Sequence, residues 1–507
     1  MSTKLRSAAL LLAMLSLLAG CASGPAATVA APPAPAAGKN GLPPAVAASG
    51  DAFGSGGLSA FAAANLPSIS AFTLSNGLPV VLRRSSANRV MALSLVIRGG
   101  AAAARPETAG LESLALAAMA RGSQGHPYEE IQALLDETSS SIGRSSGMDY
   151  STYNLVTLDK YVSRLLPVWA DTLLRPAFAK KDFDQCLSEA RLALQKKSQD
   201  PWATTALAAN EVFFAGHPYA AAPEGTKDSL GRLDLEAVKA WYASAFSANR
   251  MFVVAVGDFE PGALRKELEA SLGAIPDRKF ALPPPPPAFP LGGGPGTLAK
   301  REFPQSKGVA YVRGDFAAPA PDAPDFMAAN IGMEMLSDLL LNVVRDKYGA
   351  AYTPSSYIRD SLANYGSIVI YKTKAAGKVK SYIDEAVAEI LAGRALSSDP
   401  AAGEGARPRM GIEEALPAYK AKYANALFEG QATNAQVASR IAKAVVSSGD
   451  CRSWLLDFDR IEAVTAAGVR AALDRYLAKG KIAWVVLGSA DAILPAVDVD
   501  YEGFAPR

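Results

Sequence analysis

The second half of this 507-residue chain repeats part of its first half without a gap. Both segments have the pattern of a helix, a short polar turn, a buried strand and a closing glycine. Four positions correspond at a constant separation of 231 residues, with Val238, Tyr242, Phe246 and Gly257 matching Val469, Leu473, Leu477 and Gly488. An internal repeat of this length indicates two copies of one structural unit, so the sequence predicts two related units of about 200–230 residues each.

Strands and helices are both abundant in the first unit, and they do not strictly alternate. A doubly wound parallel sheet requires that alternation, so the order favours an α+β fold in which an antiparallel-rich sheet packs with helices. Strand-like runs lie at 72–75, 78–84, 91–97, 141–157 and 252–257, and helical periodicity lies at 109–121, 127–137, 159–175, 182–199, 201–214, 234–247 and 260–272.

The N-terminus has the pattern of a secretory signal that ends at a cysteine. Lys4 and Arg6 precede an apolar run, and a Leu-Ala-Gly triplet stands directly before Cys21. This pattern predicts a signal peptide at 1–20 and resembles the bacterial lipoprotein processing box, in which the cysteine is acylated. The alternative is an ordinary cleaved signal with an incidental cysteine. Because Ala22 follows the cysteine, we expect a lipid anchor in the outer membrane, with the protein facing the periplasm.

Composition divides the rest of the chain into four parts. Residues 21–67 are dominated by Ala, Pro, Gly and Ser, which predicts a disordered tether. Residues 276–300 contain five consecutive prolines followed by glycines, which predicts a linker. The linker separates a first domain at 68–275 from a second at 301–507.

The charge balance argues against nucleic-acid binding. The predicted signal peptide holds two basic and no acidic residues, so the net charge of +2 falls to about zero once it is removed. No basic face stands out, and we expect no nucleic-acid partner.

Few other residues could carry chemistry. The chain has two histidines, His126 and His217, each in a Gly-His-Pro-Tyr loop without a histidine nearby, and we interpret both as turn residues. Cys186 and Cys451 could pair in an oxidising compartment, although buried free thiols fit their positions better. No nucleophile motif or phosphate-binding glycine loop is evident.

Several stretches together resemble the M16 peptidase family, which includes insulinase, pitrilysin and the mitochondrial processing peptidase. The resemblance covers nearly all of 70–490 and implies a two-lobed, clam-shaped zinc-peptidase fold. It is carried by LSNGLPVVLRR at 74–84, SLVIRGGAAAARPETAGLESL at 94–114, RGSQGHPYEEIQALLDETSSSIG at 121–143, FFAGHPYAAAPEGTKDSL at 213–230 and MFVVAVGDF at 251–259.

The helix expected at Thr108–Ser123 is where active members of that family hold zinc. They carry an inverted motif, H-x-x-E-H, whose two histidines bind the metal and whose glutamate is the general base. In this chain the corresponding residues are Ser113, Leu116 and Ala117. A hydroxyl, an isobutyl and a methyl group cannot hold or use zinc, so we expect no metal and no cofactor.

The third zinc ligand of the family is a glutamate on a later helix. Counting back from Asp200, its place falls at Leu192 or Ala193, and Glu189 lies about one turn away. The resemblance therefore implies the fold of a zinc peptidase without its metal ligands.

One family feature is present in the second unit. In M16 enzymes the second lobe supplies an arginine and, seven residues later, a tyrosine that bind the substrate backbone. Arg345 and Tyr352 have this spacing, and Gly349 fits the pattern, whereas Val344 replaces the usual leucine. The alternative is an arginine at a helix C-terminus, expected near Tyr348–Gly349, and a tyrosine that begins the next strand.

A second family feature is altered in the first unit. M16 enzymes pair extended substrate with an edge strand, which would lie at Ser141–Ser146. Active members tend to have Asn-Ala-x-Thr there, whereas this chain has Gly143 and a bulky Arg144 in the first two of these positions. Glycine weakens a strand, and the sequence leaves open whether this edge binds peptide.

Together these features resemble the non-catalytic subunit of two-chain M16 peptidases. We expect a lipid-anchored chain that positions a peptide through Arg345 and Tyr352 for cleavage by an H-x-x-E-H-bearing partner. The alternative is a stand-alone peptide-binding or scaffolding lipoprotein of the cell envelope. A hydrolase with unrecognised chemistry is a third interpretation, less favoured by the sequence.

Overall fold

The computed structural model describes residues 59–291, 298–397, 407–478 and 482–496. The predicted signal peptide, the lipidation site Cys21 and most of the predicted tether lie outside the described residues. Those assignments stay predictions.

The first lobe is built on a six-stranded sheet in the order β1-β2-β6-β3-β5-β4. Only the β2–β6 pair is parallel, and every other neighbouring pair is antiparallel. The predicted run at 141–157 is two strands joined by a turn. The strands are β1 Ile69–Thr73, β2 Pro79–Arg84, β3 Val90–Arg98, β4 Ser141–Ser146, β5 Tyr150–Leu158 and β6 Met251–Gly257.

The second lobe repeats this topology, except that its described residues include no counterpart of β1. Its five-stranded sheet has the order β7-β13-β8-β10-β9, and only β7 and β13 are parallel. Strand β13 lies 231 residues after β6 at both of its ends, which confirms the internal repeat and the α+β class. The strands are β7 Leu298–Glu302, β8 Ala310–Ala317, β9 Ser355–Ile358, β10 Tyr365–Thr373 and β13 Ile482–Gly488, with a separate pair β11 Arg394–Leu396 and β12 Arg409–Gly411.

The helices follow the periodicity of the sequence closely. The first lobe contains α3 Leu111–Met119, α4 Tyr128–Glu137, α5 Val162–Leu174, α6 Lys180–Gln199, α7 Pro201–Phe213, α8 Lys227–Arg232, α9 Leu235–Ala245 and α10 Pro261–Leu272. The second lobe contains α11 Phe326–Leu340, α12 Ala376–Leu391, α13 Ile412–Glu429, α14 Asn434–Ser448, α15 Asp457–Ala463, α16 Ala466–Leu473 and α17 Ala490–Ile493.

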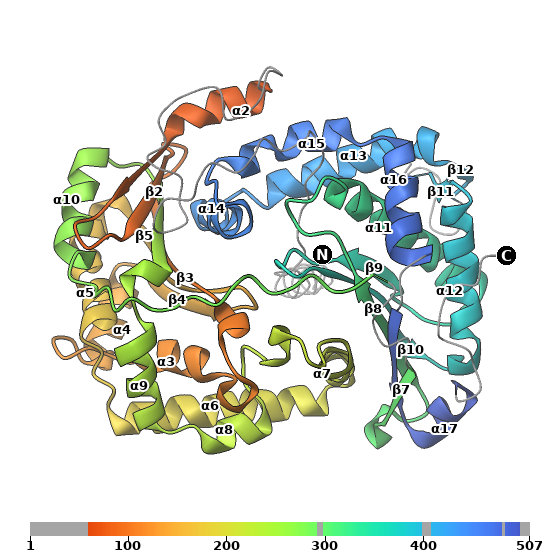
Figure 1. Ribbon diagram of the computed structural model, residues 1–507, viewed down its shortest axis with the longest axis horizontal. Coiled ribbons are helices and arrows are strands. Elements are labelled where there is room, and N and C mark those ends of the chain that lie inside the picture. Colours follow the sequence, from red (N-terminus) through yellow and green to blue (C-terminus); the bar gives the residue numbers. More distant parts are fainter. Residues whose placement is uncertain (1–58, 292–297, 398–406, 479–481, 497–507) are drawn as a thin grey trace, which may run out of the picture.

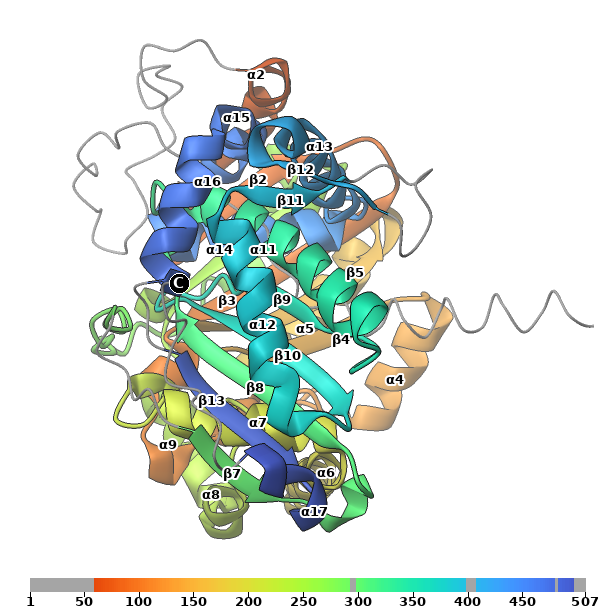
Figure 2. The same ribbon diagram turned by 90° about the vertical axis from the view of Figure 1, so that its right-hand side faces the viewer.

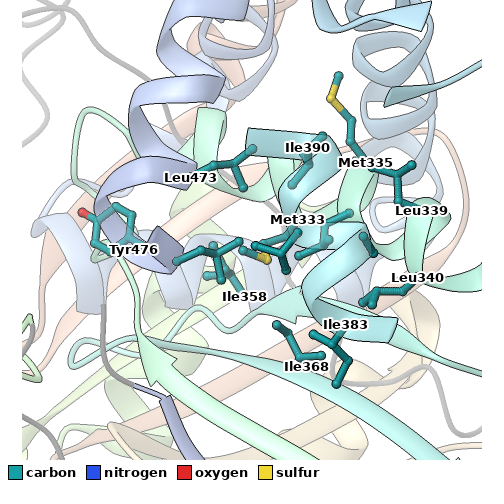
Figure 3. Close-up of a cluster of buried hydrophobic side chains, with 14 of the residues drawn as sticks. Met333, Met335, Leu339, Leu340, Ile358, Ile368, Ile383, Ile390, Leu473 and Tyr476 are labelled. Carbon is teal, nitrogen blue, oxygen red and sulfur yellow. The ribbon is translucent and has the colours of Figure 1, made fainter. Parts of the chain in front are cut away.

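Each sheet packs one face on helices of its own lobe. In the second lobe, α11, α12 and α16 converge on a core that includes Met333, Ile383 and Leu473 (Figure 3). Helix α12 crosses the outer face of this sheet (Figure 2). The stretch Phe326–Lys347 is long and apolar enough to span a membrane, but most of it is buried in this core.

The other face of each sheet is covered by a helix from the opposite lobe. Helix α14 of the second lobe lies on β3 and β6, where Ile441 is buried with Val254 (Figure 1). Helix α7 of the first lobe lies on β8 and β13, where Ala209 is buried with Val485. The lobes thus exchange equivalent helices and share apolar cores, so they hold each other in one arrangement.

The C-terminal end of the predicted tether is folded, which corrects the boundary at residue 67. Ser59 caps a short helix, α2 Ala60–Asn65, by accepting a hydrogen bond from the backbone of Ala62. The Phe61 ring packs edge-on, 4.7 Å between ring centroids, against Phe458 of the second lobe. Aromatic burial supplies the stabilisation that an Ala/Pro/Gly composition lacks.

The end of the predicted linker is also structured. Strand β7 begins at Leu298, so the last three residues of the predicted segment 276–300 pair with β13. Phe289, after the proline run, stacks on Phe214 at 5.6 Å between centroids. This aromatic contact holds that end of the proline run against the first lobe.

Candidate functional site

Helix α3 contains the three positions at which the resemblance places metal chemistry. It starts after Gly110, whose φ is 83° and whose Cβ, if present, would lie 2.7 Å from the Cα of Gly225. Leu116 is fully buried in the first-lobe core, Ala117 packs in the cluster formed with α6, and Ser113 is half-buried. Side chains that bind zinc in active family members thus correspond here to side chains that pack or are half-buried.

Helix α6 does not provide the missing ligand. Leu192 and Ala193, the expected positions, are exposed. Glu189 accepts two hydrogen bonds from Arg121 at 2.7 and 2.8 Å and one from Gln185 at 2.8 Å. The Gln185 amide and the Arg121 guanidinium lower the pKa of the Glu189 carboxyl. Within the described ranges, no three His, Cys, Asp or Glu side chains gather closely enough to hold a metal ion.

The two histidines occupy turns, as expected from their loops. The Nδ1 of His126 lies 3.2 Å from Glu130 Oε1. His217 caps the turn Pro218–Ala220, because its Nδ1 accepts a hydrogen bond from the Tyr219 backbone at 3.1 Å. The Nε2 of His217 lies 2.9 Å from the carbonyl oxygen of Pro287, so this ring also contacts the end of the proline run.

Both remaining cysteines are buried free thiols, which confirms the favoured interpretation. Burial raises the pKa of the Cys186 thiol, against the opposing charges of Arg121 and Arg144. Burial also raises the pKa of Cys451, to about 12. A thiol with a raised pKa holds its proton at neutral pH and is a poor nucleophile.

The predicted pair Arg345 and Tyr352 does come together in space. Helix α11 continues into a π-helical segment, Leu341–Lys347, that carries Arg345. The guanidinium carbon of Arg345 lies 5.0 Å from the centroid of the Tyr352 ring, a cation–π contact. Tyr352 is 70% exposed. A π-helical turn often marks a functional site, and here it carries the cationic donor Arg345, while the phenolic donor Tyr352 lies in the turn that follows.

The turn that joins these residues corrects one expectation. Tyr352 does not begin the following strand, because β9 starts at Ser355. Pro354 directly precedes β9 and has no N–H to donate to a strand partner. Gly349 has a φ of 58°, a left-handed conformation that suits glycine at the end of the helix.

Strand β4 is an edge strand, as the resemblance implied. It pairs with β5 alone, at the end of the first sheet. A Cβ placed on Gly143 would meet nothing within 4 Å, so this position is open. Among the described residues the outer edge of β4 has no strand partner, and Arg144 is the bulky charged side chain on this strand.

Two buried polar contacts were not foreseen from the sequence. Arg250 Nη2 lies 2.5 Å from Glu112 Oε2, and Glu112 also accepts a hydrogen bond from Ser151 Oγ at 2.5 Å. This ion pair joins α3 to the start of β6. Glu112 and Arg250 are 138 residues apart, and no local pattern links them.

The second unforeseen contact joins the two lobes. The Tyr219 hydroxyl donates to Asp149, and the other Asp149 oxygen accepts from the backbone of Leu362 at 2.9 Å. The Ala363 N–H donates to the Tyr219 oxygen at 3.1 Å. Burial raises the pKa of Asp149. The histidine is the residue that marks this Gly-His-Pro-Tyr loop in the sequence, but its tyrosine, Tyr219, makes the contact between the lobes.

Both halves of the chain match models of one peptidase family. Residues 79–221 match the insulinase model of peptidase family M16, and residues 232–393 match the model described as the peptidase M16 inactive domain. The first match contains α3 and β4, and the second contains Arg345 and Tyr352.

Two curated relatives and one solved structure agree with these matches. The non-peptidase homolog YmxG of Helicobacter pylori is 23% identical over 201 residues, or 40% of this chain and 46% of that protein. The mitochondrial-processing peptidase subunit alpha of Solanum tuberosum is 25% identical over 189 residues, or 36% of each. The matched part of the chain thus spans less than half the length of either relative.

The fold likeness extends much further than the sequence likeness. The crystal structure of a peptidase M16 inactive domain from Pseudomonas fluorescens superposes with a TM-score of 0.71 at 18% identity. The superposition covers 83% of this chain and 98% of that one.

Proposed function

Because the chain belongs to the M16 peptidase family as a non-catalytic member, we propose that it is the substrate-positioning subunit of a heterodimeric zinc metallopeptidase of the cell envelope. In this proposal the chain binds and orients a peptide, and a partner carrying an intact H-x-x-E-H motif cleaves it. One contrast between the lobes supports it. At the metal positions Leu116 and Ala117 are buried and Ser113 is half-buried, whereas Tyr352 is exposed and stacks on a half-buried Arg345.

The chemistry of the pair suits a positioning role. A guanidinium and a phenol are hydrogen-bond donors that can hold a peptide carbonyl and stabilise the negative charge that develops on its oxygen. The contact between Arg345 and the Tyr352 ring aligns the two donors before a substrate arrives. The partner's metal would supply the activated water that attacks the peptide.

The relatives are consistent with work in a multi-subunit assembly. One of them is by name a subunit of a processing peptidase, and another is by name a non-peptidase homolog. A chain without metal ligands needs a partner that has them if it is to take part in zinc-dependent cleavage. We propose that partner to be a second M16 chain.

The proposed location rests on the N-terminal sequence alone. Cleavage before Cys21 and acylation of that cysteine would attach the chain to the outer membrane, with the lobes in the periplasm. Mass spectrometry of the purified mature protein tests this part. A diacylated or triacylated Cys21 supports it, and a mature chain that begins at another residue contradicts it.

The experiment for the main proposal is reconstitution with an H-x-x-E-H-bearing chain. Co-purification of the two chains and chelator-sensitive peptide cleavage by the complex are expected. Arg345→Ala should lower kcat/KM of the complex by roughly 10–1000-fold, the scale for losing a donor to a developing oxyanion. Tyr352→Phe, which removes only the hydroxyl, should lower it less.

Arg475→Ala is the matched control. Arg475 is an exposed arginine of the same lobe, paired with Asp325 at 3.2 Å, in a different π-helical segment, Asp474–Ala478. We expect unchanged turnover for this variant. Equal turnover of wild-type and Arg345→Ala complexes would remove the positioning role, and failure to bind any metal-bearing chain would favour a stand-alone peptide-binding lipoprotein.

A further inference from the structure

Arg144 of the edge strand points toward the helices that carry the degenerate metal positions. In the register of the first sheet, Arg144 lies opposite Tyr153 of β5. Directly opposed residues in an antiparallel pair point to the same face of the sheet. Tyr153 is fully buried in the core that contains Leu116 of α3, and β4 itself contacts α3. The Arg144 side chain therefore projects on the α3 side of the sheet.

A second guanidinium reaches the same place from the end of α3. Arg121 follows that helix and lies 4.8 Å above the Tyr128 ring, and its Nη2 donates to both carboxylate oxygens of Glu189 on α6. Arg144 is close enough for its charge to favour ionisation of both Glu189 and Cys186 on α6. Strand β4, the end of α3 and the middle of α6 thus converge on two guanidiniums and one carboxylate.

The two arginines differ in how much of their charge is compensated. Glu189 binds Arg121 through both oxygens, so that pair is close to neutral. Arg144 is exposed and, among the residues that the structure describes, forms no ion pair or hydrogen bond through its side chain. The cluster therefore has a net positive charge, and the guanidinium that provides it is accessible from solvent.

We propose that this cluster is a carboxylate-binding site, in which the Arg144 guanidinium takes the ligand and Arg121, held by Glu189, borders it. The planar guanidinium suits a carboxylate because it can donate two parallel hydrogen bonds. Because Arg144 lies on the edge strand β4, we infer that the carboxylate belongs to a peptide that pairs with this edge.

Two sources of the carboxylate share this chemistry. One is the free C-terminal carboxylate of a peptide, and the other is an Asp or Glu side chain within it. The inference does not rest on Arg345 or on a partner chain, because the site lies wholly in the first lobe. Its failure and the failure of the proposed function are therefore distinguishable.

The test uses the purified full chain and fluorescein-labelled peptides about ten residues long, rich in Ala, Ser and Gln. Fluorescence anisotropy compares four peptides, which end in a carboxylate or an amide and contain Glu or Gln at a central position. We expect at least one carboxylate to tighten binding about 10-fold, the scale for a charge-assisted hydrogen bond. The gain should shrink as salt rises from 50 to 500 mM, about the range over which screening removes exposed charge interactions.

Arg144→Gln should abolish that gain while leaving the weak binding of the uncharged peptide unchanged, and Arg144→Lys should restore part of it. Arg164→Gln is the control, because Arg164 is an exposed arginine of the same lobe paired with Glu137 at 2.6 Å. Arg345→Ala should leave the carboxylate gain intact. If binding tightens only when the peptide ends in a carboxylate, the ligand is the C-terminus; if it tightens only when the central residue is Glu, the ligand is a side chain. Either result supports the site. No carboxylate gain, or a gain that survives Arg144→Gln, overturns it.

Discussion

Replacing Glu112 by alanine should destabilise the first lobe strongly, although Glu112 lies beside a metal position that has no metal ligand. The reason is Arg250, whose side chain is 1% exposed and whose Nη2 lies 2.5 Å from the Glu112 carboxylate. Without that carboxylate, the partners of Arg250 in the described part of the chain are uncharged. These are the Arg98 carbonyl at 2.5 Å, the Ala245 carbonyl at 3.4 Å and the Phe280 ring at 4.7 Å.

The size of the effect follows from the burial of the charge left behind. Removing one partner of a buried ion pair costs about 3–5 kcal/mol, because the remaining ion stays desolvated without compensation. Glu112 is itself 12% exposed, so some water reaches the pair and the lower end of the range is the better expectation. Replacing both partners, as in Glu112→Ala with Arg250→Met, should recover part of the loss.

Urea unfolding followed by tryptophan fluorescence measures the loss, with Glu211→Ala as the matched control. Glu211 is 70% exposed and pairs with Arg301 at 3.5 Å, so its removal should have little effect on the unfolding midpoint. If Glu112→Ala shifts the midpoint no more than the control does, Arg250 is solvated in its native position and the buried-charge reasoning is refuted.

Two further predictions concern the contacts made by the second lobe. Phe61→Ala should speed amide hydrogen exchange in α2, because the edge-on contact with Phe458 holds that helix; unchanged exchange would show that other contacts suffice. Asp457 is buried, which raises its folded-state pKa from 3.8 to about 6, so the folded chain binds this proton more tightly than the unfolded chain. Its contribution to the free energy of unfolding should therefore fall as pH rises from about 4 to 6, and a wild-type pH profile that parallels Asp457→Asn would contradict this.

Much of the architecture followed from local patterns. The helical periodicity and the strand-like runs were confirmed by the observed helices and strands, and the 231-residue repeat by β6 and β13 at equivalent positions. The exchange of α7 and α14 between lobes was not predicted, because periodicity tells which face of a helix is apolar but not which sheet covers it. Which sheet each of these helices covers is determined by contacts between residues far apart in the sequence.

The residues of the candidate site likewise include some that a local pattern predicts and others that it does not. The spacing of Arg345 and Tyr352 was enough to bring them together, since a helix end and one turn join them. Their role stays a proposal. The pair Glu112–Arg250 and the lobe contact of Tyr219 with Asp149 depend on residues far apart in sequence, and no local signal marks them. The orientation of Arg144 required the register of β4, which the sequence alone did not provide.

The central claim is that this chain retains the M16 fold and has no metal site of its own. The most direct measurement is zinc content per chain by elemental mass spectrometry, on protein purified without a partner and without chelator, together with a peptide-cleavage assay. We predict zinc far below one ion per chain and no cleavage that a chelator abolishes. One tightly held zinc per chain, with cleavage that depends on it, would contradict the account.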